Sequence, residues 1–402
     1  MKHNEANLSS IGFVSTYPPT SCGLATFTAA LRGAMADARG SDEGLDVVSL
    51  VDTRLDEPGQ EVVYQHVNGD SASLEEAVRI LNTHDVVLFQ HEYGIFGGPD
   101  GAEVLDLIDG LEIPAIVTLH TVLSDPTPSQ KRILERLIEL AAETVVMSET
   151  ALRRLERRYD VDPMKLRVVP HGAMSSLAGP SLANGTRPVV LTWGLIGPGK
   201  GLETAIEAFA DLRDLRPQPR YIILGKTHPK VQAAHGDDYL IGLKDLAHSL
   251  GLDDVVEFDS RYLDLETLTT EVRSADFVLL PYESTEQVTS GVLVEAVAAG
   301  KPVVATAFPH AVEMLAAGPG TVVPHADATA MAGALRDLLS NPEHAARMAN
   351  VARTVATTLF WPAVAAQYEA IASRLTADPP PVTALTGARQ SPRPADDLAR
   401  VS

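Results

Sequence analysis

The stretch PVVLTWGLIGPGKG at residues 188–201 contains a strand, a turn and the start of a helix. Its first part is a short apolar run rich in β-branched residues, which is typical of a buried strand. Four glycines then interrupt the run before an amphipathic stretch begins at Leu202. A buried strand, a glycine-rich turn and a helix, in this order, predict the repeating unit of a parallel α/β sheet.

The same unit recurs on both sides of this stretch. Before it, strands are expected at Ile11–Ser15, Val47–Val51, Asp85–Gln90, Ala115–Leu119, Thr144–Met147 and Leu166–Val169. From it onward, strands are expected at Pro188–Thr192, Tyr221–Leu224, Val255–Phe258, Phe277–Leu280, Pro302–Ala305 and Gly320–Val323. Helical periodicity is expected at Ala25–Ala36, Ser129–Ala141, Leu202–Leu215, Tyr239–Leu250, Leu265–Ser274, Gly291–Ala299, Ala328–Leu339 and Pro362–Leu375. The alternation predicts parallel sheets with helices on both faces.

The alternation stops between Ala173 and Arg187, where Ser, Gly, Asn and Ala predominate without a period. After Thr376 the chain is rich in proline and aperiodic, which is typical of a disordered tail. The expected divisions are an N-terminal domain at 1–175, a linker at 176–187, a C-terminal domain at 188–358, a helix at 359–375 and a tail at 376–402. Ligands of open parallel sheets bind beyond the carboxyl ends of the strands, so the cleft between the domains is the expected site.

The composition excludes several classes of protein. The chain has 402 residues, of which 45% are apolar and 21% charged, and its net charge is −21. Such an acidic surface repels phosphate backbones, and no run of Lys or Arg offers a nucleic-acid site. One cysteine, Cys22, permits neither an intrachain disulfide nor a four-cysteine metal site. The polar residues 1–10 do not resemble a secretory signal and no apolar run approaches a membrane span, so a cytoplasmic protein is expected.

The glycine-rich turn from Gly194 to Gly201 is a candidate phosphate site. Glycines let the backbone approach a ligand, the start of the following helix favours anions, and Lys200 adds a positive charge. Gly201 stands where a Walker A loop requires Ser or Thr, and the spacing of the glycines is not that of a dinucleotide-binding fingerprint. The alternative is a plain strand–helix turn with a surface lysine.

Residues 281–296, PYESTEQVTSGVLVEA, form a second candidate. Ser290 is a good N-cap, and the amides of residues 291–293 would then point out of the helix start toward the strand ends. Glu295 lies about one turn further into an apolar helix, where a carboxylate needs a partner or a ligand hydroxyl. The alternative is a capped helix with Glu295 in a structural salt bridge.

Four histidines follow expected strands on the ligand side of their sheets: His91, His120, His171 and His228. A single histidine at a strand end is more often a hydrogen-bonded structural residue, but four together favour a role in the cleft. Their spacing is not that of a zinc motif, and no metal site is expected.

The loop STYPPTSCGLAT at residues 15–26 lies between the first expected strand and helix. Its prolines stiffen it, and Gly23 near the helix start would let the backbone face a substrate. A rigid turn with no such role is the alternative. Cys22 is expected to be a bystander rather than a nucleophile, because nothing nearby in the sequence would depress the pKa of its thiol. A similar loop, EYGIFGG, follows at residues 92–98.

In their order and placement, these motifs resemble the retaining, nucleotide-sugar-dependent glycosyltransferases of family 4, which have the GT-B fold. The resemblance runs from Ile11 to Leu375 and is strongest over Trp193–Asp327. There the glycine loop with its lysine, the turn GKTHP, the segment PYESTEQVTSGVLVEAVAAGKPVVAT and the strand end VPHAD follow in family order. The resemblance implies two Rossmann-like, doubly wound domains that face a central cleft, with the helix at 359–375 packing back on the N-terminal domain.

The resemblance also implies residue roles. In the C-terminal domain, Lys200 would bind the donor diphosphate with the amides of Gly291 and Val292, and Glu295 would hold ribose hydroxyls. The base would pack near Arg261 to Leu263. The expected donor-site residues are Gly23, Gly194, Lys200, Arg261, Leu263, Gln287, Ser290, Gly291, Val292 and Glu295. The expected catalytic residues are His120, which matches the family histidine near the transferred sugar, Lys200 and Glu295.

Two positions depart from the family pattern. Gln287 replaces the first acid of the Glu-x7-Glu motif, and a Gln-x-x-Ser-Gly form occurs in some branches of the family. Leu195 stands near the place of the basic residue that usually precedes the lysine, so the donor phosphates have one fixed cation fewer. Arg261 or Lys226 could compensate.

The resemblance implies transfer of a hexosyl group with retention of configuration, from guanosine diphosphate mannose or uridine diphosphate glucose, to a glycan, lipid or small-molecule acceptor. Front-face attack with the leaving diphosphate as base requires stabilised charge and a positioned acceptor, with no cofactor or metal. The alternatives are a nucleotide-sugar 2-epimerase, a phosphorylase, for which no pyridoxal phosphate lysine is identified, and a non-catalytic sugar-nucleotide-binding protein. Peripheral membrane contact, the oligomeric state, the linkage formed and the acceptor stay open.

Overall fold

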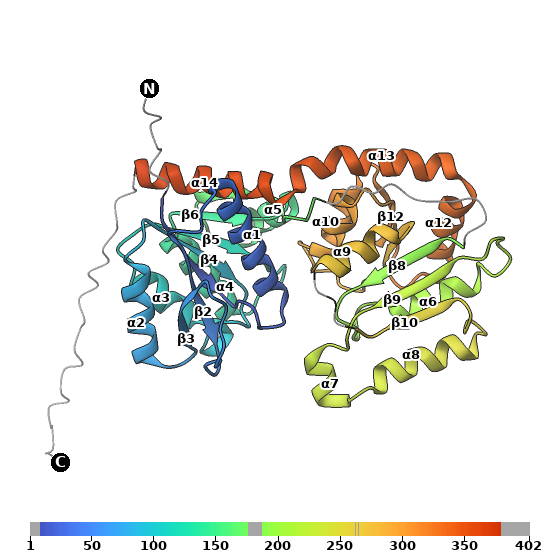
Figure 1. Ribbon diagram of the computed structural model, residues 1–402, viewed down its shortest axis with the longest axis horizontal. Helices are drawn as coiled ribbons and strands as arrows, with labels where there is room; N and C mark the ends of the chain where they lie inside the picture. The colour runs from blue at the N-terminus through green and yellow to red at the C-terminus, as the bar shows by residue number, and fades with distance from the viewer. Residues whose placement is uncertain (1–8, 176–186, 262, 264, 379–402) are drawn as a thin grey trace, which may run out of the picture.

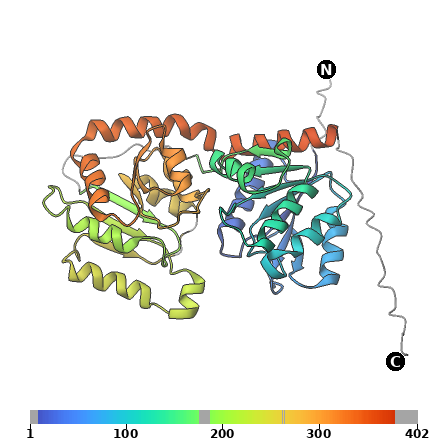
Figure 2. The ribbon, with the colours of Figure 1, turned by 180° about the vertical axis from the view of Figure 1, so that it is seen from behind.

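The computed structural model describes residues 9–175, 187–261, 263 and 265–378. The expected linker at 176–187 and tail at 376–402 fall outside these residues except at their edges. The chain forms two α/β domains side by side, and the last two helices run along one side of both (Figure 1, Figure 2). The expected fold of two Rossmann-like domains is confirmed.

The N-terminal domain contains a seven-stranded parallel sheet in the order β3-β2-β1-β4-β5-β6-β7. Its strands are β1 Ile11–Ser15, β2 Leu45–Val51, β3 Val62–Val67, β4 Val86–His91, β5 Ala115–Leu119, β6 Glu143–Val146 and β7 Leu166–Val168. Its α-helices are α1 Gly23–Arg39, α2 Ser71–Leu81, α3 Glu103–Asp109, α4 Pro128–Leu140 and α5 Glu149–Arg158, with 3₁₀ turns at Pro99–Gly101 and Pro163–Lys165.

The C-terminal domain contains a six-stranded parallel sheet in the order β10-β9-β8-β11-β12-β13. Its strands are β8 Val189–Trp193, β9 Arg220–Leu224, β10 Val256–Asp259, β11 Phe277–Leu280, β12 Val303–Thr306 and β13 Gly320–Val323. Its helices are α6 Leu202–Ala210, α7 Pro229–His235, α8 Asp238–Ser249, α9 Leu265–Ser274, α10 Gly291–Ala298, α11 Pro309–Leu315, α12 Ala328–Ser340 and α13 Pro342–Leu359.

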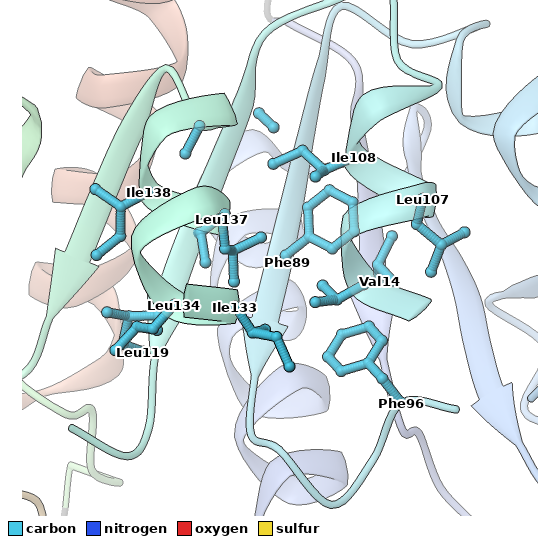
Figure 3. Close-up of a cluster of buried hydrophobic side chains, with 14 of the residues drawn as sticks. Val14, Phe89, Phe96, Leu107, Ile108, Leu119, Ile133, Leu134, Leu137 and Ile138 are labelled. Atoms are coloured by element: carbon cyan, nitrogen blue, oxygen red, sulfur yellow. The ribbon is translucent and has the colours of Figure 1, made fainter. Parts of the chain in front are cut away.

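Each sheet is buried on both faces because its strands carry apolar residues at successive positions. In the N-terminal domain, Phe89 and Val14 point to the side of α3 and α4, where they share one apolar cluster with Leu107 and Ile108 of α3 and Leu134 and Leu137 of α4 (Figure 3). Leu88, next to Phe89 in the chain, points to the opposite side and packs in a second cluster under α1 and α14. The two clusters cover the two faces of the sheet, so its strands are buried on both sides.

In both domains, the candidate motifs follow the strands at which the strand order of the sheet reverses. The order reverses direction between β1 and β4 in the first sheet and between β8 and β11 in the second. At such a switch point the loops diverge and leave a crevice for a ligand. The loops after β8 and β11 are the glycine-rich turn and residues 281–290, and the loop after β1 leads to Gly23, the first residue of α1.

Helices α13 and α14 carry the chain back from the second domain to the first. α13 packs on α10 and α12, and α14, Trp361–Ala377, packs on α1. At the crossing, the Ala173 amide donates to the Leu359 carbonyl at 2.8 Å, and the Trp361 amide donates to the Ala173 carbonyl at 3.0 Å. The two segments that connect the domains, one after β7 and one between α13 and α14, are therefore hydrogen-bonded to each other.

The structure adds helices that are not among the expected elements, such as α7, α11 and α13, and two further differences have a physical reason. Strand β3 was not expected, because it is a half-exposed edge strand with mixed polarity rather than an apolar run. The helix expected at Leu202–Leu215 ends at Ala210 as α6. Arg336 from α12 binds the Asp211 carbonyl just beyond the helix end, and Pro217 disfavours helical geometry at the residue before it.

Candidate active site

The two C-terminal motifs meet in one cavity. The Glu283 amide donates to the Gly199 carbonyl at 3.0 Å and joins the loop after β11 to the glycine-rich turn after β8. The cavity measures about 410 Å³ and is lined by Pro198, Gly199, Lys200, Tyr282, Glu283, Ser284 and Gln287. Lys200 and Gln287, which the sequence analysis assigned to separate motifs, therefore face the same space.

Lys200 is held over an aromatic ring rather than by a carboxylate. Its Nζ lies 4.5 Å from the centroid of the buried Tyr282 ring, an arrangement in which the ring face attracts the cation. Burial lowers the pKa of Lys200. A largely buried ammonium with an aromatic partner retains its hydrogen-bond donors for an anionic ligand. Nothing in the sequence around Tyr282 predicts this role, because the ring meets Lys200 only through the folding of β8 beside β11.

The start of α10 adds backbone donors on the cleft side. Ser290 is the N-cap: its Oγ accepts the Leu293 amide at 3.3 Å, and its own amide donates to His310 Nδ1 at 2.8 Å. The amides of Gly291 and Val292 lie in the first turn, where a helix offers them no carbonyl. The expectation of an exposed amide at Leu293 is wrong because the cap binds it, so two amides remain available.

Glu295 lies one turn into α10 and is largely buried. The Trp193 indole Nε1 donates to its carboxylate at 3.3 Å. Burial raises the pKa of Glu295 to about 7, and the bond from Trp193 offsets part of that rise. Among the ion pairs of the described residues there is none with Glu295, which removes the salt-bridge alternative for this part of the chain. A carboxylate with one weak partner in a cleft is suited to accept ligand hydroxyls.

Gly194 brings the glycine-rich turn close to the start of α10. A Cβ built on Gly194 would lie 4.0 Å from Val292, and the φ of Gly194 is +122°. Only glycine adopts such a conformation readily. The expected donor residues Gly194, Lys200, Gln287, Ser290, Gly291, Val292 and Glu295 thus gather around the strand ends of β8 and β11.

The rings of His120, Phe27 and His171 contact one another in this order. The Nε2 of His120 is 2.8 Å from Gln90 Oε1, and the His120 and Phe27 rings are packed edge to face with their centroids 4.8 Å apart. Phe27 in turn contacts His171 at 5.0 Å. His171 Nε2 stands 2.9 Å from the position a Cβ would occupy at Gly291. His171 therefore lies against the start of α10, and His120 lies on the other side of Phe27.

The cleft histidines are neutral at pH 7. Burial lowers the pKa of His120 to about 3 and that of His171 to about 4, and burial also lowers the pKa of His310 to about 4. A hydrogen bond at 2.7 Å joins His171 Nδ1 and the Gly172 carbonyl, so Nδ1 carries the proton and Nε2 faces Gly291 as an acceptor. These imidazoles can accept or donate hydrogen bonds to a ligand without adding a fixed charge.

The other N-terminal candidates differ in their surroundings. Gly23 begins α1, and a Cβ built on it would meet nothing within 4 Å, so open space lies above it. Cys22 is the N-cap of α1: its sulfur accepts the Ala25 amide at 3.4 Å and contacts the Thr16 hydroxyl at 3.0 Å. Its packing is that of a helix cap.

The remaining histidines do not join the cavity. His91 is fully buried against Tyr93 and Phe96, and burial lowers its pKa to about 4. His228 caps α7 by accepting the Lys230 amide at 3.2 Å. His228 has the hydrogen-bonded structural role that a single strand-end histidine most often has, whereas both ring nitrogens of His91 are buried without a hydrogen-bond partner among the described residues.

Arg261 and Leu263 lie at the end of β10. The Arg261 guanidinium forms ion pairs with Asp259 and, at 3.6 Å, with Glu271. Arg261 lines a separate groove of about 420 Å³, while Leu263 packs against the apolar cluster under α10. Because two carboxylates already neutralise Arg261, the structure does not make it a replacement for the missing cation at Leu195.

Within the described residues, no group of three or more His, Cys, Asp or Glu side chains is arranged to hold a metal ion. In the same part of the chain, every helix is too short or too polar to cross a bilayer. One further residue of the donor loop escaped the sequence analysis: the Thr289 hydroxyl is buried and has no partner among the described residues. Thr289 lies between an apolar residue, Val288, and the N-cap, Ser290, and nothing in the sequence marks it as a ligand-binding residue.

Two protein-family models match the chain, one in each domain. The family model described as Glycosyltransferase Family 4 matches residues 43–174, and the model described as Glycosyl transferases group 1 matches residues 177–355. The chain is 29% identical over 289 residues to a D-inositol 3-phosphate glycosyltransferase from Corynebacterium efficiens, and the match covers 66% of each chain.

Two further matches are a sequence relative and a solved structure. A GDP-mannose-dependent alpha-(1-6)-phosphatidylinositol monomannoside mannosyltransferase from Mycolicibacterium smegmatis is 33% identical over 170 residues, which cover 41% of this chain and 42% of the relative. Sucrose-phosphate synthase from Thermosynechococcus elongatus superposes with a TM-score of 0.70 at 20% identity, covering 91% of this chain and 99% of that one. The chain therefore belongs to the GT-B glycosyltransferases, with a family 4 domain followed by a group 1 domain.

Proposed function

We propose that the protein transfers a hexosyl group, with retention of configuration, from a nucleoside diphosphate sugar to a hydroxyl acceptor held by the N-terminal domain. The observation that carries this proposal is the convergence of Lys200, Gln287 and the start of α10 around the strand ends of β8 and β11, with Glu295 one turn behind. A cation and two backbone amides suit a diphosphate, and a carboxylate suits ribose hydroxyls.

The donor is proposed to be guanosine diphosphate mannose or uridine diphosphate glucose. The name of the mannosyltransferase from M. smegmatis supports the mannose donor, and this relative aligns with 41% of the chain. The acceptor is a glycan, a lipid or a small molecule with a free hydroxyl. The protein is proposed to act in the cytoplasm. Its site is proposed to use no resident metal or cofactor.

The proposed transfer proceeds by front-face attack. The bond between the anomeric carbon and the phosphate oxygen breaks, and the acceptor oxygen bonds to the same face of that carbon. The acceptor proton passes to the leaving phosphate oxygen, so no protein base is required. The protein then stabilises the charge that develops on the diphosphate, through Lys200 and the amides of Gly291 and Val292, and positions both substrates.

A thermal-shift screen against nucleoside diphosphates and nucleotide sugars, with and without magnesium, tests this function. A ligand that binds only the native state raises its stability by about 2.7 kcal/mol at a concentration 100 times Kd. We expect one nucleoside diphosphate and its sugar to stabilise the protein to the same degree in both arms. Stabilisation only with magnesium would contradict the metal-free site, and no response to any compound would contradict the function.

The pKa of Glu295 gives a prediction for donor binding. With a pKa of about 7, the carboxylate is about one-tenth ionised at pH 6 and about nine-tenths at pH 8. Ribose hydroxyls donate to the ionised form, so the affinity for the nucleotide sugar should rise by up to about 10-fold from pH 6 to pH 8. Isothermal titration calorimetry with the nucleotide sugar, whose diphosphate diester does not titrate in this range, measures the change.

The Glu295→Gln variant is the control for this pH dependence. It keeps the size of the side chain and removes the ionisation, so its affinity should be nearly constant between pH 6 and pH 8. The cleft histidines have a pKa of about 3 to 4 and stay neutral over the range. An unchanged pH profile in Glu295→Gln would show that another group is responsible.

A further inference from the structure

The loop between β11 and α10 bonds to both domains. It belongs to the C-terminal domain and carries Gln287, which lines the cavity with Lys200. The residues on either side of Gln287, Glu286 and Val288, contact the N-terminal domain instead. The conformation of the proposed sugar-binding residue therefore depends on contacts across the cleft.

Glu286 forms the polar half of these contacts. Its carboxylate accepts the Ser124 amide at 2.9 Å and the Ser124 hydroxyl at 2.6 Å. Arg154 of α5 donates to the same carboxylate at 3.0 Å and to the Glu286 carbonyl at 3.0 Å. Arg154 also donates to the Val122 carbonyl at 2.7 Å, so one guanidinium joins Glu286 to the loop that precedes Ser124.

Val288 forms the apolar half. Its side chain is 3% exposed and packs in the apolar cluster of the N-terminal domain, together with residues of α4 and α5. The Ser148 hydroxyl donates to its carbonyl at 2.7 Å. Between these anchors, the Gln287 carbonyl accepts the His310 amide at 3.2 Å. We use the term clasp for Ser124, Ser148 and Arg154 of the first domain with Glu286 and Val288 of the second.

A second carboxylate reinforces the same contact. Glu313 of α11 accepts the amides of Glu149 and Thr150 at 2.9 and 2.7 Å. These amides begin α5, where a helix has unpaired donors and a partial positive charge. The C-terminal domain thus holds α5 at its first turn and at Arg154.

The charge state of Glu286 suits this role. Burial acts to raise the pKa of its carboxyl, but the hydrogen bonds from Ser124 and the positive charge of Arg154 outweigh that effect and hold the pKa below its usual value. The carboxylate is therefore ionised at neutral pH, as its bonds from one guanidinium, one amide and one hydroxyl require.

We infer that Glu286 and Arg154 are positioning residues that hold Gln287 against the transferred sugar when the two domains are closed. The inference rests on the proposed function and deepens it. It makes domain closure and placement of the sugar-binding loop one event, because the loop reaches its position only when docked on α5. The residues proposed to bind the nucleotide, Lys200, Gly291 and Glu295, all lie in the C-terminal domain and do not need the clasp.

This division gives a measurable signature. Breaking the clasp should leave the affinity for a nucleoside diphosphate unchanged, weaken binding of the nucleotide sugar and lower turnover. Misplacement of a reacting group by about 1 Å costs about 100-fold in rate, so we expect Arg154→Met to lower kcat by about 10- to 100-fold. Glu286→Gln, which keeps the shape but not the charge, should lower kcat less than Arg154→Met.

The matched control is Arg157→Met, on the same helix. Arg157 is exposed, and its side chain makes no ion pair or hydrogen bond among the described residues. The change in net charge and helix propensity is the same as in Arg154→Met, so kcat and KM should stay within about twofold of the unmodified enzyme. If Arg157→Met and Arg154→Met lower kcat equally, or if Arg154→Met leaves kcat unchanged, the inference is wrong. Loss of nucleoside diphosphate affinity in Arg154→Met alone would also overturn it.

Hydrogen exchange of the unliganded full chain provides a readout independent of activity. Peptides that cover residues 283–290 should exchange faster in Arg154→Met than in Arg157→Met, because undocking exposes their amides. Equal exchange would overturn the clasp even if the folded enzyme has no turnover. If instead the unmodified protein binds no nucleotide but shows this difference, the proposed function fails while the docking of the loop stands.

Discussion

Replacing Lys200 by Met is expected to raise the Kd for the nucleoside diphosphate by about 10- to 100-fold and to lower kcat by about 100- to 1000-fold. The methionine keeps the length of the stem and its contact with the Tyr282 ring, so the loss is that of the charge. The effect should be large because Lys200 is the one cation in the glycine-rich turn, where Leu195 adds no charge. With Arg261 bound to Asp259 and Glu271, Lys200 carries the fixed positive charge of the cavity lining.

The control for Lys200→Met is Lys230→Met. Lys230 is exposed in the first turn of α7 and outside the cavity lining, so the variant changes the net charge equally and leaves the site intact. Calorimetric titration with the nucleoside diphosphate measures affinity, and release of that nucleotide from its sugar in the presence of an acceptor measures turnover. Near-normal turnover in Lys200→Met would contradict the phosphate role of this residue.

Part of the fold follows from local sequence. Ile11–Ser15, Ala115–Leu119 and Phe277–Leu280 are strands with the expected bounds, because an apolar run of this length buries its side chains on both faces of a covered sheet. Gly320–Val323 also has the expected bounds, although this edge strand buries only Val323. The strand β3 lacks this signal because its sheet-edge position leaves Val63 exposed. The end of α6 depends on Arg336, which lies more than a hundred residues further along the chain.

The candidate site shows the same division. The cap at Ser290, the glycines of the turn and the isolated carboxylate at Glu295 can be predicted, because each depends on neighbours within one or two helical turns. The contact of Arg154 with Glu286 cannot, since 132 positions separate the two residues and neither belongs to a local pattern. Lys200 over Tyr282 likewise depends on the adjacency of β8 and β11, which the strand order creates.

That adjacency explains why Gly201→Ala should be the most damaging single-methyl change in the donor site. Gly201 has a φ of +63°, and a Cβ built on it would lie 1.9 Å from the Pro281 carbonyl oxygen. The obstacle is backbone at the end of β11, which no side-chain rotation can relieve. We expect a loss of about 3 kcal/mol or more in the free energy of unfolding, because strain and a backbone clash add.

Gly199→Ala separates the two causes. Gly199 has a φ of +83° in the same turn, but a Cβ on it would meet nothing within 4 Å. It should therefore carry only the left-handed penalty of about 1 to 2 kcal/mol. Thermal unfolding of the two variants measures the difference, and equal losses would mean that the turn moves away from Pro281 at little cost.

The clash at Gly201 also has a functional consequence, because Gly201 and Pro281 adjoin the two loops that line the cavity. A displacement that relieves the clash must move Lys200 away from Gln287, so Gly201→Ala should also weaken nucleotide-sugar binding in whatever fraction remains folded, whereas Gly199→Ala should leave that fraction with a formed cavity.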